Sequence, residues 1–254
     1  MNDCLIGYTG FVGGNLVNTR SFAHLYNSKN FKEMQDKKFG TIICSGLPAE
    51  KWKINQNPEA DLLNLKELMK ALDTVSCDQF ILISTVDVFP NGNGHDENYD
   101  CASTANHAYG THRFMFEEFV RKKFPSALIL RLPALFGTGL KKNVIFDLIH
   151  NNCLHMINPE SSFQYYDLAD LGLDIELALR SGLKVVNLVT EPIASSEILD
   201  RFFPGKSVGE QKANKASYNL KTLHASAFGG PEGYIRNKQT VLQKLAIYLK
   251  QAGV

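Results

Sequence analysis

Apolar residues along the chain come in short, nearly unbroken runs separated by longer segments of mixed character. The runs are rich in β-branched side chains, which is typical of parallel strands whose two faces are both covered by helices. They predict six strands, at residues 4–8, 23–26, 41–45, 80–85, 127–132 and 184–189.

The segments between these runs carry apolar residues at helical spacing. In residues 61–72 one face collects Leu62, Leu65, Leu68, Met69 and Leu72. Further helices are expected at residues 12–19, 107–123, 144–151, 171–180, 195–203 and 238–251. Strands that alternate with helices in this way predict βαβ units, and therefore an α/β fold with a Rossmann-type doubly wound parallel sheet.

The alternation loosens after about residue 137. Residues 137–143, 158–162 and 204–217 are polar and rich in turn formers, and we expect loops there. We therefore predict a Rossmann core over residues 1–137. Residues 138–254 should form a mixed region that returns one strand to the sheet and builds a small C-terminal substrate-binding subdomain.

Composition narrows the class of protein. The chain has 254 residues, 44% of them apolar and 21% charged, with a net charge of +1, so we expect a soluble protein without a nucleic-acid or membrane partner. The N-terminal residues do not have the pattern of a signal peptide. The five cysteines are scattered without a C-x-x-C pair, which favours a reducing, cytoplasmic location over disulfides or zinc. The histidines form no metal-ligand pattern, so no metal is expected.

A glycine motif follows the first predicted strand. Gly7, Gly10 and Gly13 have the spacing G-x-x-G-x-x-G, and the segment then opens a helix. Glycines in this context let the backbone approach a pyrophosphate, which the helix N-terminus binds through free N–H groups. We expect a dinucleotide here, with Thr9, Phe11 and Val12 completing the loop; a glycine-rich turn without a ligand is the alternative.

The turn after the second predicted strand bears on the choice of dinucleotide. In this fold an acidic residue there binds both ribose hydroxyls and favours NAD. Asn27, Ser28 and Lys29 offer no carboxylate and one cation, which favours NADP over NAD. A solvated turn is the alternative, because all three residue types are common in turns.

A candidate proton-transfer site lies further along the chain. Tyr109 and Arg113 are four residues apart on a predicted helix, and a neighbouring guanidinium is expected to lower the pKa of a phenol. Thr85 ends the fourth predicted strand and could orient a substrate oxygen. Taken alone, a Tyr/Arg pair at this spacing is also common as an ordinary packing or surface pair.

Several segments together resemble a known superfamily. They are residues 7–13, 44–46, 82–89, 109–113, 130–137 and 167–171. As an ordered set they resemble the extended short-chain dehydrogenase/reductase superfamily, in particular its NAD-dependent epimerase/dehydratase branch acting on nucleotide sugars. The resemblance covers essentially the whole chain.

The resemblance implies roles for individual residues. Thr85 would hydrogen bond to the reacting oxygen, Tyr109 would be the catalytic acid/base, and Arg113 would replace a lysine that binds the nicotinamide ribose. Further residues would border the cofactor or the substrate diphosphate: Ser45, Gly46, Ser84 and Pro133 for the cofactor, Lys142 and Asn143 for the substrate.

Departures from the family pattern narrow the range of expected activities. Arginine is a planar fork rather than a compact ammonium, so ribose contact and tyrosine activation are both altered. Where dehydratases carry an Asp-Glu pair, this chain has Val86 and Asp87. Asp87 could protonate or deprotonate a sugar carbon, or be a loop carboxylate that caps or faces solvent. His112, beside Arg113, is expected at the surface.

We therefore expect an NAD(P)-dependent oxidoreductase or epimerase acting on a nucleotide-linked sugar, with hydride transfer and Tyr109 as acid/base. The alternatives are a non-catalytic NAD(P)-binding regulator that senses redox state, and a pseudoenzyme scaffold. A homodimer is compatible with the sequence.

Overall fold

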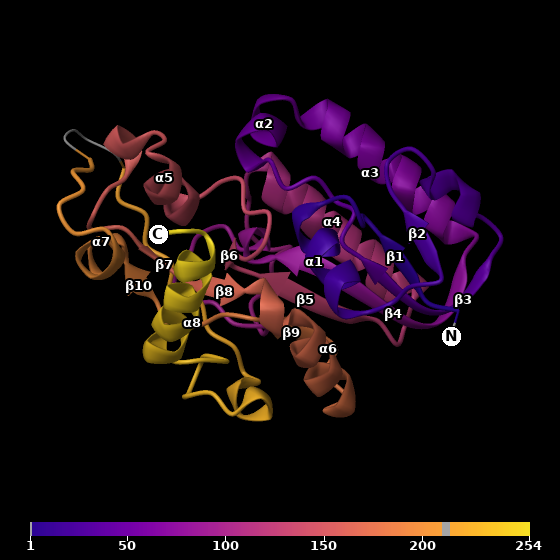
Figure 1. Ribbon diagram of the computed structural model, residues 1–254. Helices are drawn as coiled ribbons and strands as arrows, with labels where there is room; N and C mark the ends of the chain where they lie inside the picture. The colour runs from indigo at the N-terminus through magenta and orange to yellow at the C-terminus, as the bar shows by residue number, and fades with distance from the viewer. Residues whose placement is uncertain (1, 210–213) are drawn as a thin grey trace. The chain divides into compact units, whose positions relative to one another are not determined.

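The computed structural model describes residues 2–209 and 214–254 (Figure 1). Residues 210–213 of the predicted loop at 204–217 lie outside the described residues. A six-stranded parallel sheet has the order β2-β1-β3-β4-β5-β9. Its strands are β1 (Cys4–Ile6), β2 (His24–Tyr26), β3 (Lys38–Cys44), β4 (Ser76–Thr85), β5 (Leu128–Leu132) and β9 (Val185–Asn187). All six predicted runs are in this sheet, so the predicted Rossmann-type fold class is confirmed.

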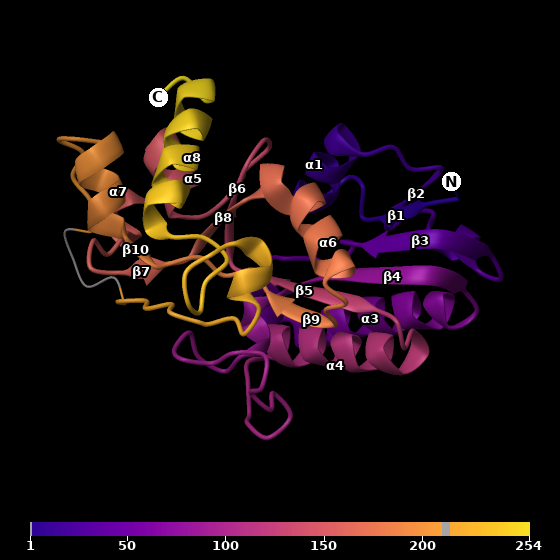
Figure 2. The same ribbon diagram turned by 90° about the horizontal axis from the view of Figure 1, so that it is seen from below.

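Helices cover both faces of the sheet. The main ones are α1 (Phe11–Thr19), α3 (Pro58–Asp73), α4 (Ala108–Lys123) and α6 (Leu171–Arg180), with a short α2 (Lys51–Gln56) before α3. Figure 2 shows α3 and α4 on one face, and α1 and α6 on the other. Single turns of 3-10 helix connect elements at η1 (Phe31–Met34), η2 (Val86–Val88), η3 (Leu154–Met156), η4 (Leu168–Asp170) and η5 (Ala225–Phe228).

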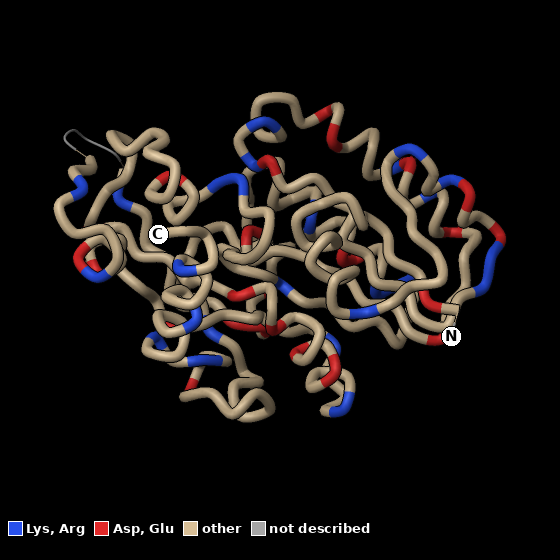
Figure 3. Tube along the Cα trace, viewed as in Figure 1, with Lys and Arg blue, Asp and Glu red and all other residues tan. Residues whose placement is uncertain are grey.

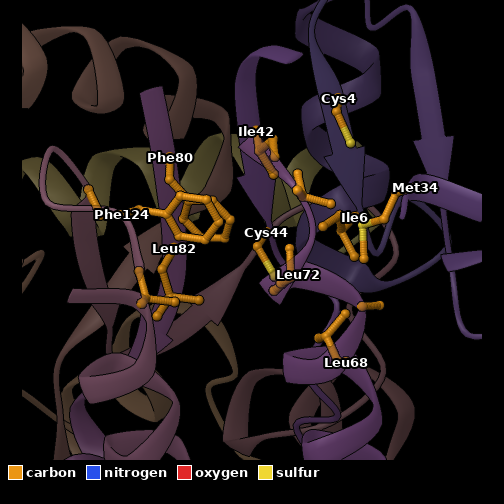
Figure 4. Close-up of a cluster of buried hydrophobic side chains, with 14 of the residues drawn as sticks. Cys4, Ile6, Met34, Ile42, Cys44, Leu68, Leu72, Phe80, Leu82 and Phe124 are labelled. Carbon is orange, nitrogen blue, oxygen red and sulfur yellow. The ribbon is translucent and has the colours of Figure 1, made fainter. Parts of the chain in front are cut away.

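The core between the sheet and α3/α4 is apolar. Residues from β1, β3 and β4 pack against the inner face of α3, as Figure 4 shows for Cys4, Ile42, Leu68, Leu72 and Leu82. Phe80 of β4 stacks on Phe124 with ring centroids 4.3 Å apart. This rigid layer fixes the carboxyl ends of β1, β3 and β4, from which the candidate site residues project.

The chain divides into two compact units. The first holds residues 1–90, 98–131 and 171–186, and the second holds 91–97, 132–170 and 187–254. The predicted division at residue 137 therefore differs from the observed one. The reason is that α6 and β9 return to cover and extend the first unit's sheet, while residues 132–137 leave it.

The second unit is built from short elements. Its β6 (Ala134–Phe136) pairs with β8 (Tyr165–Asp167) in parallel, and β7 (Ser162–Phe163) pairs with β10 (Ile193–Ala194) in antiparallel orientation. Its helices are α5 (Val144–His150), α7 (Ser195–Phe202) and α8 (Lys238–Gln251). Buried Gln164 ties loops together, since its amide donates to the carbonyls of Thr190 and Leu220 and accepts the N–H of Leu220.

Charge is spread along both units. Figure 3 shows acidic and basic residues interspersed along the trace, in keeping with the net charge of +1. Among the helices formed by residues 2–209 and 214–254, none has the length and apolar character needed to cross a membrane.

Candidate active site

The glycine loop lies between β1 and α1, in the first unit. Gly7 has φ +93°, and a Cβ there would be 2.5 Å from the Cα of Gly46. A Cβ on Gly13 would be 2.1 Å from the Gly7 carbonyl oxygen. Both distances are too short for any side chain, so glycine is required at these two positions. The loop is therefore a tight backbone cradle, as the motif predicts.

The start of α1 offers unsatisfied donors. Gly10 is the N-cap residue, and neither a side-chain cap nor an acidic residue in the first turn satisfies the free N–H groups. The first-turn N–H groups and the positive end of the helix dipole favour an anion at this point. Thr9 and Gly10 are exposed, and Phe11 and Val12 are the first two residues of the helix. These features fit a dinucleotide pyrophosphate.

The end of β3 lies beside this loop. Ser45 is hydrogen bonded to the end of β1, because its N–H and its hydroxyl both donate to the Ile6 carbonyl, at 2.9 and 3.1 Å. Gly46 is exposed and its backbone contacts Gly7. The structure thus brings these two predicted cofactor neighbours to the glycine loop.

The turn after β2 is held by asparagine side chains. The Asn27 amide donates to the Tyr8 hydroxyl at 3.2 Å, and its carbonyl oxygen accepts the Lys29 N–H at 2.8 Å. Ser28 and Lys29 are exposed. The side chain of Asn27 therefore makes its hydrogen bonds within the protein, while the side chains of Ser28 and Lys29 face solvent.

The end of β4 meets the start of α4 at very short range. The Thr85 hydroxyl caps η2 by accepting the Asp87 N–H at 3.1 Å. A Cβ on Gly110 would be 2.2 Å from the Asp87 carbonyl oxygen, so only glycine allows α4 to pack here. Asn106 reinforces the contact by donating to the same carbonyl at 2.9 Å. This packing places the buried Tyr109 beside Thr85 and Asp87, as predicted.

The environment of Tyr109 opposes its ionisation. Burial raises the pKa of the phenol, and the nearby Asp87 carboxylate raises it further, whereas Arg113 and a hydrogen bond with Thr85 lower it. The net direction is upward. The predicted lowering of the Tyr109 pKa by Arg113 is present, but it is outweighed because the phenol is almost fully removed from water.

Arg113 forms a buried ion pair that the sequence did not predict. Its two Nη atoms bind the two carboxylate oxygens of Asp61 at 3.0 and 2.9 Å, and one also donates to the Pro48 carbonyl at 2.7 Å. Only 2% of the Arg113 side chain is exposed. Its guanidinium carbon lies 4.7 Å from the Tyr109 ring centroid. The guanidinium is thus fixed against Asp61 and the ring.

His112 is a correction to the sequence-based expectation. It is buried rather than at the surface, and its Nδ1 lies 2.7 Å from Oδ2 of Asp61. Burial raises the pKa of Asp61, but hydrogen bonds from Arg113 and His112 reverse this and hold it below its usual value. Asp61 occupies the buried face of α3 with Leu65 and Leu68, and this lone acid on an apolar face was the available signal for a buried partner.

Two further residues near Tyr109 were missed. Lys51, the first residue of α2, binds Asp87 through Nζ and Oδ1 at 2.7 Å. His107 caps α4, its Nδ1 accepting the Gly110 N–H at 2.9 Å. Burial and the Lys51 charge lower the pKa of His107, against a smaller opposite effect of Asp87. No spacing pattern links Lys51 to Asp87, which lies 36 positions away.

A second buried charge cluster lies behind β4. The predicted cofactor neighbour Ser84 donates its hydroxyl to Glu117 at 2.7 Å. Arg131 binds the same carboxylate at 2.7 and 3.0 Å, and its guanidinium carbon lies 5.0 Å from the Phe89 ring centroid. The Ser84 hydroxyl therefore points to α4 and is bound to Glu117 within the protein.

Three predicted site residues belong to the second unit. Pro133 is half-buried between β5 and β6, and Lys142 is exposed. Asn143 caps α5, its side chain accepting the Phe146 N–H at 3.1 Å and donating to the Leu135 carbonyl at 2.7 Å. Both polar atoms of the Asn143 side chain are thus hydrogen bonded to backbone groups of the protein. Among residues 2–209 and 214–254, no three His, Cys, Asp or Glu side chains gather as a metal site.

No protein-family model and no curated protein matches the chain. Solved structures match it at low identity. The Bordetella bronchiseptica enzyme WbmG in complex with NAD has a TM-score of 0.73 at 16% identity, over 98% of this chain and 94% of that one. A dTDP-4-dehydrorhamnose reductase from Clostridium acetobutylicum has a TM-score of 0.70 at 14% identity, over 100% of both chains. UDP-glucose 4-epimerase from Thermotoga maritima, with UDP-glucose, has a TM-score of 0.66 at 14% identity, over 89% and 91%.

The parallel sheet and the glycine cradle after its first strand define a Rossmann-type α/β protein. More narrowly, the chain has the same fold as these solved structures, which include a reductase and an epimerase.

Proposed function

We propose that the protein binds a nicotinamide dinucleotide and acts as a reductase or epimerase on a nucleotide-linked sugar, with Tyr109 as the acid/base. One observation carries the proposal. In the unit that holds the Gly7–Gly13 cradle, the buried Tyr109 phenol lies at the carboxyl end of β4, where the Arg113 guanidinium and the Thr85 hydroxyl both act to lower its pKa. Ligands of doubly wound sheets bind at the carboxyl ends of the strands, where these groups lie.

The chain's own groups would hold the dinucleotide. The first-turn N–H groups of α1 would bind its pyrophosphate, and the exposed Gly46, whose backbone contacts Gly7, would border it. When bound, a nicotinamide ring supplies the hydride chemistry that amino-acid side chains cannot. Tyr109 would donate or accept the proton of a sugar hydroxyl, and Thr85 would orient that oxygen.

The class of substrate is inferred from the similar structures. Two of them are a dTDP-sugar reductase and a UDP-sugar epimerase. For this chain, Lys142 is an exposed cation of the second unit that is suited to a diphosphate. Asn143 would contribute through its backbone, because its side chain caps α5.

The dinucleotide preferred would be NADP. This part rests on the turn after β2, where exposed Ser28 and Lys29 can meet a 2′-phosphate and Asn27 offers no carboxylate. Comparing the dissociation constants of NADPH and NADH, with and without Lys29→Ala, tests it. We expect Lys29→Ala to weaken the binding of NADPH and to leave the binding of NADH unchanged. Tighter binding of NADH than of NADPH, unchanged by the substitution, would contradict the assignment.

The main test has two stages. Calorimetry should show binding of a nicotinamide dinucleotide at micromolar concentration, and a panel of UDP- and dTDP-linked hexoses and 4-keto-hexoses should then be assayed for conversion. Millimolar or weaker binding of all four nicotinamide cofactors would contradict the first stage. Turnover of at least one nucleotide sugar, lost in Tyr109→Phe, would support the second.

A redox-sensing binder without catalysis is the second candidate. The observation that favours it is that Asp61 binds both Nη atoms of Arg113, so these donors of the predicted cation are already used within the protein. It predicts that the oxidised and reduced cofactors bind with different affinities, and that none of the nucleotide sugars in the panel is converted. The retained Tyr109 and Thr85 pair favours the enzyme, because a binder needs neither hydroxyl.

A further inference from the structure

The arginine nearest the phenol is held in place by the protein itself. The two Nη atoms of Arg113 bind both oxygens of Asp61 and the Pro48 carbonyl, and 2% of its side chain is exposed. Turning the guanidinium toward solvent would leave the buried Asp61 carboxylate with His112 as its remaining partner, which is unfavourable. A cation of this site that also reaches solvent must therefore come from another element.

The short helix α2 brings another cation to the same place. Lys51 and Asn55 are four residues apart and share a face of α2. Asn55 accepts the Tyr109 N–H at 3.0 Å, which docks this face against the start of α4. On that face the Lys51 ammonium lies 2.7 Å from Asp87, and 37% of its side chain is exposed. In contrast to Arg113, it reaches solvent.

We propose that Lys51 is a positioning residue for the Tyr109 site: its ammonium, paired with Asp87, neutralises the carboxylate that lies beside the phenol and opposes its ionisation. The inference rests on the proposed function in that Tyr109 is taken to move a proton. Its first test does not depend on turnover.

The charged groups around Tyr109 and His107 determine in which direction their pKa values move when the Lys51 charge is removed. Tyr109 faces Asp87, which raises its pKa, and Arg113, which lowers it; Arg113 is itself bound to Asp61, whose other partner is His112. His107 faces Lys51, which lowers its pKa, and Asp87, which raises it. Removing the Lys51 charge therefore moves the pKa of His107 upward directly. The pKa of Tyr109 moves upward through Asp87, whose charge is then less well neutralised.

The first experiment follows His107 by NMR titration of the intact protein, its ring signal assigned with His107→Asn. We expect Lys51→Met to raise the His107 pKa by about half a unit or more, and Lys51→Arg to restore it. Lys53→Met is the matched control, because Lys53 lies on the same helix, is 64% exposed and pairs only at 3.6 Å with Glu50. Asp87→Asn should shift the pKa of His107 downward, so the two substitutions have opposite signs.

The second experiment measures the pH dependence of kcat. In Lys51→Met the basic limb should move upward, with kcat near neutrality reduced about tenfold, KM for the cofactor nearly unchanged, and rescue by Lys51→Arg. An unchanged His107 pKa, or an unchanged basic limb in an active enzyme, overturns the inference. If the wild type has no turnover but Lys51→Met shifts His107 as expected, the proposed function fails while the role of Lys51 in the charge balance stands.

Discussion

At the scale of single residues, burial decides what Arg113 does. A guanidinium beside a phenol lowers the phenol's pKa in isolation, yet here the phenol is removed from water and the guanidinium is bound to Asp61. The sequence spacing correctly places Arg113 next to Tyr109. It cannot reveal Asp61, which is 52 positions away and meets Arg113 only because α3 packs on α4.

Arg113→Lys should destabilise the protein. Lysine can keep one bond to Asp61 but loses the parallel pair and the bond to Pro48, so we expect a loss of about 1–3 kcal/mol in the free energy of unfolding. Urea denaturation measures this. Arg180→Lys is the control, since Arg180 is 77% exposed and its ion pair with Glu176 should matter by less than about 0.5 kcal/mol. Equal effects of the two substitutions would remove the structural role given to Arg113.

Tyr109→Phe should separate chemistry from binding. The ring still packs over the Arg113 guanidinium, while the proton-bearing oxygen is gone. We expect turnover to fall by a factor on the order of 100 or more, with cofactor affinity nearly unchanged. Steady-state kinetics and calorimetry provide the two readouts, and Tyr99→Phe, which loses the bond from the Tyr99 hydroxyl to Thr104, is the control. Full activity in Tyr109→Phe would exclude the tyrosine from the mechanism.

At the scale of elements, periodicity was informative wherever an element is long enough to repeat. The six strands of the sheet and all of the longer helices were predicted within a few residues. Helix α2 was missed because only Ile54 of its six residues is buried, while Trp52 is exposed. Strands β6, β7, β8 and β10 have two or three residues each and were not predicted. Strands β1, β2 and β9 are also only three residues long, but each lies within a longer apolar run of the sequence.

The start of α1 provides a prediction that uses two adjacent glycines. Gly13→Ala forces a Cβ to within 2.1 Å of the Gly7 carbonyl, whereas the Cβ in Gly14→Ala would have its nearest neighbour at 3.9 Å. We expect Gly13→Ala to weaken dinucleotide binding at least about tenfold, because the cradle must open. Gly14→Ala should bind normally and gain about 0.5–1 kcal/mol in stability, as alanine replaces glycine within a helix. Calorimetry and thermal unfolding on both variants check this, and identical behaviour would contradict the cradle geometry.

At the scale of the whole molecule, the buried carboxylate of Asp61 makes stability depend on pH. Its pKa is lowered in the folded state, so its contribution is complete above the unfolded value of about 3.9 and is lost as the pH falls through the folded value. The free energy of unfolding should therefore fall as the pH drops below about 4. Asp61→Asn should be less stable at pH 7 but show a shallower decline. If the free energy of unfolding falls equally steeply with pH in the wild type and in Asp61→Asn, Asp61 does not cause the loss of stability in acid.

The division into units is the part of the fold that sequence patterns could not give. The first short strand of the second unit, β6, covers Ala134–Phe136, just before the alternation loosens in the sequence. Which unit a segment joins depends on contacts across the chain, as when α6 packs beside α1 on the first unit's sheet. The same limit holds for Lys51 and Asp87: each residue type is ordinary in a loop or helix start, and only the packing of α2 on α4 makes them a pair.

The return of residues 171–186 to the first unit also affects how the protein is made. Five strands of the sheet are complete once residue 132 has been synthesised, but β9 follows only at residue 185. During that interval β5, whose five residues are all buried in the finished protein, has an open edge. Exposed apolar edges recruit other chains, so a growing polypeptide is vulnerable while the intervening segment emerges from the ribosome. Fragments ending between residues 132 and 185 should therefore aggregate, and chaperones that bind nascent chains should protect this stage of synthesis.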